Sequence, residues 1–179
     1  GRESETPGSV NFNNINASIS NLTNIKERIA QNAECKVIAS TLFLGTGKLN
    51  TEWRLPLSTN DSTFTVTGRL QQMDATQLNK VSVPLGMTAI KKGLINDLTF
   101  NFTGTNYSSK GEVLFLYKDL NIKVLKKNKE DELVDKDLTS FIANLIVKNS
   151  NPQNGVVRSG AIDFKRDISK SFFNFLWKS

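Results

Sequence analysis

The chain has 179 residues, of which 38% are hydrophobic and 22% are charged, and its formal net charge is +6. This length suits one folded domain, and no apolar run reaches the roughly 18 residues that a membrane-spanning helix needs, so we expect none. Histidine is absent, which excludes Ser-His and Cys-His nucleophile pairs and histidine-based metal sites. The basic residues are scattered rather than interleaved with aromatic residues, so nucleic acid is not an expected partner.

Alternating apolar and polar residues predict β-strands along most of the chain. The alternation is broken in phase at Asn13 and Asn14, and a second break after Tyr117 predicts a bulge or a shift of register. The sequence GTGK at 45–48 is interpreted as a hairpin turn. The predicted strands are 9–19, 36–44, 48–57, 63–70, 98–105, 111–125 and 156–164.

Three segments are predicted to form short helices. The first begins at Asp74, a suitable N-cap, and ends before Pro84. The second begins at Asp137 and has apolar residues at helical spacing. The third, at 170–179, carries lysine and asparagine on one face. Its remaining positions are the apolar residues Phe172, Phe173, Phe175, Leu176 and Trp177.

Together these elements predict a mainly β fold with a few helices (α+β). We expect a curved antiparallel sheet, or a half-open barrel or groove, covered by two or three short amphipathic helices. No linker divides the chain, so residues 1–179 are interpreted as a single domain. Residues 1–8 are polar and contain Gly and Pro, and are interpreted as disordered or as a remnant of cloning.

Residues suited to catalysis are few in this sequence. The acidic residues near position 130 crowd a polar loop and a helix start, where solvation and capping account for them. The single cysteine, Cys35, has no partner at ligand spacing and is expected to be buried. We therefore expect no enzyme activity, no cofactor and no metal.

A series of short motifs from about residue 60 to the end resembles the C-terminal portion of AsmA-like envelope proteins of Gram-negative bacteria. The motifs mark strands, turns and helices, so the resemblance carries over no catalytic residue. In chain order they are Met73 to Thr76, Pro84 to Gly86, Phe100 to Gly104, Tyr117 to Leu120 and Lys170 to Ser179.

The resemblance implies a periplasmic protein that is anchored in the inner membrane by a segment outside this sequence. Proteins of this family resemble elongated β-sheet grooves with apolar interiors. The resemblance therefore implies a role in lipid transport between membranes or in outer-membrane maintenance. The implied partners are phospholipid or another lipid, other envelope proteins, or the rest of the same chain.

Two sets of apolar residues are the candidate sites. The candidate groove face consists of Phe100, Phe102, Val113, Phe115 and Tyr117, and these residues also suit an ordinary core. The segment from Phe172 to Trp177 suits a lid on the sheet, a membrane-contact helix or a docking helix for a partner protein. The first functional hypothesis is a module that shields lipid acyl chains; the alternative is a scaffold or protein-interaction domain with a fully packed core and no ligand.

Overall fold

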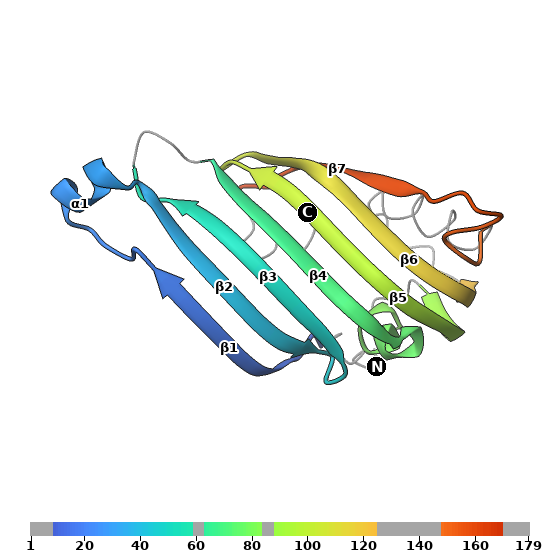
Figure 1. Ribbon diagram of the computed structural model, residues 1–179. Helices are drawn as coiled ribbons and strands as arrows, with labels where there is room; N and C mark the ends of the chain where they lie inside the picture. The colour runs from blue at the N-terminus through green and yellow to red at the C-terminus, as the bar shows by residue number, and fades with distance from the viewer. Residues whose placement is uncertain (1–8, 59–62, 84–87, 125–147, 170–179) are drawn as a thin grey trace, which may run out of the picture.

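The computed structural model describes residues 9–58, 63–83, 88–124 and 148–169. Within them the chain forms one open antiparallel sheet, in which each strand pairs with the next strand in sequence (Figure 1). The predicted mainly β fold with an open, curved sheet is therefore confirmed. The strands are β1 (Phe12–Ser20), β2 (Glu34–Phe43), β3 (Gly47–Pro56), β4 (Phe64–Asp74), β5 (Thr88–Gly104), β6 (Ser108–Val124) and β7 (Ser159–Lys165).

Both predicted irregularities of the strands are present. In β1 the register against β2 shifts between Asn13 and Asn16, and Asn14 takes the left-handed conformation with φ of 53°. In β6, Asp119 has the same φ value, near a shift in the pairing with β5. Asparagine and aspartate tolerate this conformation better than most residues, which explains why the bulges fall there. The turn predicted at 45–48 also joins β2 to β3.

The pairing register divides the sheet into an apolar and a polar face. Residues opposite one another on adjacent strands project from the same face. One row on the apolar face runs from β1 to β5 as Ile19, Val37, Trp53, Val66 and Phe102. The other face, here called the polar face, carries the charged residues Lys36, Glu52, Arg54, Arg69 and Asp97 among others.

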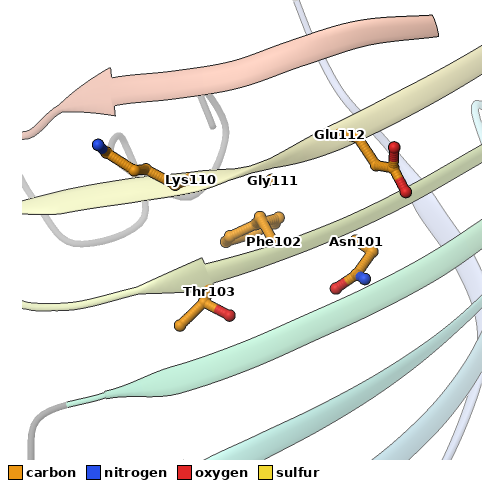
Figure 2. A pocket seen from close by; sticks show the side chains of 6 residues that line it. All are labelled: Asn101, Phe102, Thr103, Lys110, Gly111 and Glu112. Carbon is orange, nitrogen blue, oxygen red and sulfur yellow. The ribbon is translucent and has the colours of Figure 1, made fainter.

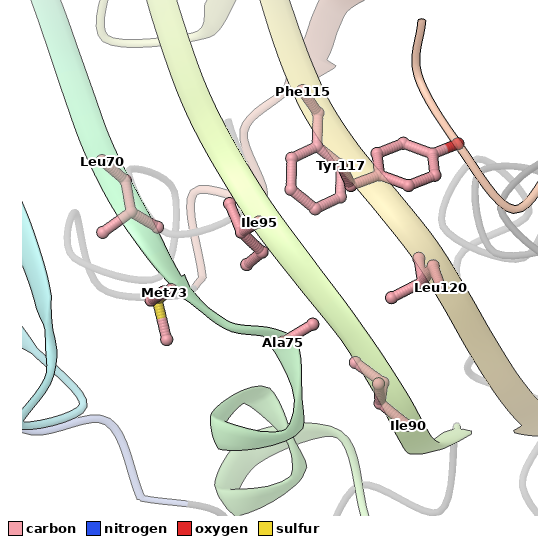
Figure 3. Packing of buried hydrophobic residues seen from close by; sticks show 8 residues of the cluster. All are labelled: Leu70, Met73, Ala75, Ile90, Ile95, Phe115, Tyr117 and Leu120. Atoms are coloured by element: carbon pink, nitrogen blue, oxygen red, sulfur yellow. The ribbon is translucent and has the colours of Figure 1, made fainter. Parts of the chain in front are cut away.

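The larger buried cluster lies on the apolar face where β4, β5 and β6 meet a short helical segment (Figure 3). This segment comprises the 3-10 turn η1 (Ala75–Leu78) and the single turn α2 (Asn79–Ser82). The side chain of Asn79 binds both backbone groups of Ile90 in β5, at 2.7 and 2.8 Å. The helical segment is thereby fixed to one end of the sheet. The cluster consists of Leu70, Met73, Ala75, Ile90, Ile95, Phe115, Tyr117 and Leu120.

A smaller buried cluster depends on glycines that lie opposite aromatic residues. It contains Phe64 and Phe102, whose rings meet edge to face with centroids 6.3 Å apart. Phe64 lies opposite Gly104 in the pairing, and its ring covers that glycine. The ring of Phe100 covers Gly68 in the same way. Each glycine leaves space that the neighbouring ring fills, so these pairs favour one register over its neighbours.

The helices differ from prediction in part. The helix predicted from Asp74 is present as η1 and α2, and the side chain of Asp74 caps it as expected. The helix α1 (Lys26–Gln31), which lies between β1 and β2, was not predicted; it buries no residue and so lacks the apolar stripe that would mark it. The helices predicted at 137–149 and 170–179, and residues 1–8, lie largely or wholly outside the described residues.

Gly111 in β6 offers a sharp test of strand packing. A Cβ atom there would collide with the carbonyl oxygen of Asn101 and lie 2.5 Å from Cα of Phe102. Because these are backbone atoms of β5, the strands would have to separate, and we expect Gly111→Ala to lower the free energy of unfolding by about 2–3 kcal/mol. In the control Gly160→Ala the nearest atom is a flexible side chain, Cγ1 of Val113 at 3.1 Å. Equal losses of unfolding free energy in the two variants, measured by urea denaturation, would contradict this packing.

The Asp74 cap predicts a pH-dependent stability. Hydrogen bonds from the backbone N–H and then the hydroxyl of Thr76, both 2.8 Å long, lower the pKa of Asp74 from its ordinary value. A lowered folded-state pKa gives stability that is present above the unfolded-state pKa and is lost as pH falls through the folded-state pKa. Asp74→Ala should therefore lower the urea midpoint at pH 7, and the difference from the wild type should shrink below pH about 4. A difference that stayed constant with pH would contradict the ionised cap.

Candidate functional site

The structure places all five predicted groove residues on the apolar face. Phe100 pairs with Val113, while Phe102, Phe115 and Tyr117 occupy neighbouring rows. The latter three are buried, with no more than 9% of their surface exposed. In the described chain these three therefore belong to the core, and Phe100 and Val113 are half-buried at its border.

Tyr117 shows how the segment from Lys148 to Asn151, which returns toward β7, is held at the edge of β6. Its ring contacts that of Phe115 with centroids 4.9 Å apart, and its hydroxyl donates to the carbonyl of Lys148 at 2.8 Å. Asn151, which is 3% exposed, pairs with the backbone of Tyr117 and donates from its side chain to the carbonyl of Phe115. These bonds hold the returning segment against β6, and its polar groups are satisfied there.

The apolar face becomes progressively more exposed toward β1. Along the row described above, Val66 is 1% exposed, Trp53 and Val37 are half-buried, and Ile19 is 55% exposed. Ile15, two residues before Ala17 on the same face, is 66% exposed. We call this region the exposed apolar strip. It consists of Phe12, Ile15, Ala17, Ile19, Val37, Ala39, Thr51, Trp53 and Leu55.

Small side chains form one row inside the strip. Ala17, Ala39, Thr51 and Gly68 lie opposite one another on β1 to β4, and the ring of Phe100 covers the glycine at the end of the row. The neighbouring row carries the larger side chains of Ile19, Val37 and Trp53. The surface of the strip is therefore uneven as well as apolar, because the row of small residues lies lower than the row of large residues beside it.

Trp53 supplies the largest apolar side chain of the strip. Its indole N–H donates to Oγ1 of Thr51 on the same strand, at 3.0 Å. The one polar group of the ring is therefore satisfied within the protein. The half-buried ring remains available for apolar contact without leaving a donor unpaired.

The polar face is organised by ion pairs between neighbouring strands. Glu52 binds Lys36 at 3.0 Å and Arg54 at 2.8 Å, and Arg54 also binds Glu34 at 3.1 Å. The hydrogen bond from Lys36, aided by Arg54, lowers the pKa of Glu52 from its ordinary value. This carboxylate remains ionised at neutral pH, which suits a solvated structural role better than that of a general acid.

Two shallow hollows lie outside the strip's centre. One, of about 300 Å³, lies over β5 and β6, where polar side chains surround the Phe102–Gly111 pair (Figure 2). The other, of about 310 Å³, lies at the end of β2 to β4. Neither combines an enclosed apolar space with convergent polar groups, as small-molecule sites do. The second is lined by Asn32, Ala33, Glu34, Arg54, Leu55, Pro56, Thr63 and Thr65.

Other kinds of site are not found in the part of the chain that the structure describes. No group of three or more cysteine, aspartate or glutamate residues there is arranged to hold a metal ion. No helix among those residues is long and apolar enough to cross a membrane. Cys35 is buried, as its sequence context predicted. The predicted lid residues, from Phe172 to Trp177, lie outside the described residues.

The chain matches no protein-family model, and no curated protein or solved structure is significantly similar to it.

The exposed end of the apolar face was not predicted as a site. The alternation in β3 did place Trp53 and Leu55 on an apolar face, but alternation alone does not tell which half of that face another segment covers. That depends on where the η1–α2 segment docks, and the bonds from Asn79 to Ile90 join residues that are 11 positions apart and belong to no common periodic pattern. The one available signal was Ile15 and Ile19 in a strand with no charged residue.

A matched pair of variants tests whether the strip is exposed in solution. Ile19 is 55% exposed on the apolar face, and Ile38 is 50% exposed on the polar face. We expect Ile19→Ser and Ile38→Ser each to change the free energy of unfolding by less than about 1 kcal/mol. Only Ile19→Ser should reduce the fluorescence of the apolar dye bis-ANS bound to the folded protein, because only Ile19 belongs to a continuous apolar surface. Equal loss of dye signal in both would argue against the strip.

Proposed function

We propose that the chain is a non-enzymatic module of an AsmA-like envelope protein that binds and shields lipid acyl chains on the exposed apolar strip. The observation that carries the proposal is the gradient of exposure on one sheet face, from buried Val66 to largely exposed Ile19. A continuous apolar surface of this kind, bordered by polar residues, is typical of an interaction site rather than of ordinary surface.

The chemistry of the strip fits an acyl chain. An alkyl chain has no hydrogen-bonding group, and its transfer from water to an apolar surface contributes about 0.8 kcal/mol for each buried CH₂. The small row of Ala17, Ala39 and Thr51 provides a place for such a chain, with Val37 and Trp53 beside it. Several buried methylenes would offset the loss of freedom on binding.

The opposite face fits contact with water and anionic headgroups. Its carboxylates at Glu34, Glu52 and Asp97 are paired with basic side chains. The net charge of +6 favours approach to an anionic lipid surface. A module with one ion-paired face and one apolar face can itself remain in an aqueous compartment and still keep an acyl chain out of water.

The envelope setting rests on the sequence motifs. They coincide with specific features of the fold: Met73 to Thr76 form the capped junction between β4 and η1, and Tyr117 to Leu120 contain the bulge of β6. We propose a periplasmic location, an inner-membrane anchor outside this sequence, and a role in lipid transport or outer-membrane maintenance. Phospholipid is the proposed ligand.

Fluorescence quenching of Trp53 tests the proposal directly. The chain has two tryptophans, so Trp177→Phe leaves Trp53 as the only reporter. Phosphatidylglycerol with brominated acyl chains should quench Trp53 at saturable lipid concentrations, whereas the same lipid without bromine should not. Ala39→Leu fills the row of small residues and should weaken apparent lipid affinity by about tenfold, which corresponds to about 1.4 kcal/mol.

The matched control is Ser40→Leu, which adds a leucine to the next residue of β2, on the polar face. It should leave quenching unchanged, because its side chain projects away from the strip. Non-specific apolar adsorption would instead be increased by both leucines. Absence of quenching in the folded Trp177→Phe protein would favour the alternative of a scaffold without ligand.

A further inference from the structure

We propose that β1 is a self-association edge, through which two copies of the chain pair antiparallel and continue one sheet across a two-fold axis. Within the described residues, β1 stands at the end of the strand order and pairs only with β2 (Figure 1). All nine of its residues are exposed. A free strand edge presents backbone groups that can accept another strand.

The edge of β1 lacks the features that usually prevent such pairing. Its sequence, FNNINASIS, contains no charged residue and no proline. The strand at the opposite end of the order, β7, is shorter and carries Asp163 and Lys165. Charges on an edge strand oppose the approach of another strand, so the two edges differ in their capacity for pairing. The bulge at Asn14 limits the regular part of β1 to Asn16–Ser20, which pairs with β2 without a shift.

The pattern of exposed apolar residues around β1 is self-complementary. In an antiparallel pair of two copies with Ala17 opposite Ala17, Ile15 of each copy lies opposite Ile19 of the other. These two isoleucines are 66% and 55% exposed, respectively. Each of the two isoleucines of β1 thus meets the other in one symmetric register, as an isologous contact requires.

The polar side of the same register is also compatible. Asn16 of one copy lies opposite Ser18 of the other, so uncharged hydrogen-bonding side chains face each other. No like charges are brought together on the strand. Pairing of β1 with β7 of another copy would instead place Asp163 and Lys165 against an uncharged strand and would generate an open filament. The favoured occupant of this edge is therefore β1 of a second copy, paired with it symmetrically.

Pairing through β1 would also join the exposed apolar strips of the two copies. The strip begins at β1 on each chain, and residues opposite across the new ladder would share one face. The combined apolar surface would then cross both sheets. This inference rests on the edge and its residues, and it does not require that lipid binds.

Charge variants on the polar face test the dimer without altering the strip. In Asn16→Lys/Ser18→Lys, the two-fold register places like charges opposite each other, and the same holds for Asn16→Glu/Ser18→Glu. The wild type should show a concentration-dependent rise in mass toward that of a dimer in sedimentation equilibrium, and each variant alone should remain a monomer. An equimolar mixture of the two variants should again form dimers, because lysine then faces glutamate.

The matched control is Gln71→Lys/Asn101→Lys, which adds the same charge to the polar face opposite Asp97 and Glu112, far from β1 in the strand order. It should dimerise like the wild type. Circular dichroism and urea midpoints establish that each variant is folded. A wild type that stays monomeric at all concentrations would overturn the proposal, and so would a mixture that fails to associate while both components are folded.

A second measurement fixes the register. Ala17→Cys should form an intermolecular disulfide upon mild oxidation, because the two Ala17 positions face each other in the proposed dimer. Ala161→Cys, on the charged edge strand β7, should not cross-link above the wild-type level, and Cys35 is buried. Efficient cross-linking through Ala161→Cys but not through Ala17→Cys would show that the copies associate through β7 instead of β1, and would overturn the inference.

Discussion

Adjacent residues of a strand project to opposite faces of the sheet, so the pairing register decides which residues meet water. A slip of one position in β4 would turn Phe64 and Val66 outward and bring Arg69 inward. The glycine and aromatic pairs oppose such a slip on one face, and the ion pair between Arg69 and Asp97, at 2.7 Å, opposes it on the other. Core, ion pairs and exposed strip all depend on this register.

Within the described residues, the two halves of the apolar face differ because the η1–α2 segment packs on only one of them. At β4 to β6, the η1–α2 segment and the return near Asn151 supply polar partners as well as apolar contacts. At β1 to β3, the same face ends in a strand whose residues are all exposed. The packed half is thus held by contacts with other segments of the chain, whereas the exposed half presents apolar side chains to water.

Local patterns in the sequence predicted the strands, the break in alternation at Asn13 and Asn14, and the Asp74 cap, because each depends on residues close together in the chain. They did not predict α1, which buries nothing and leaves no periodic signal. Nor did they show that Phe115 and Tyr117 would be core while Ile19 would be exposed. That distinction depends on the docking of Asn79 and Asn151, and such long-range contacts have no local pattern.

The strand order has a consequence for how the chain reaches this structure. Within the described residues every pairing joins strands that are consecutive in sequence, but β7 begins only at Ser159, long after β6 ends at Val124. The short connections from β1 to β6 carry a small loop-closure cost, whereas the pairing of β6 with β7 closes a longer loop. A chain that emerges with its N-terminus first can therefore add β2 to β6 one at a time to a growing sheet, and β7 joins after a longer wait.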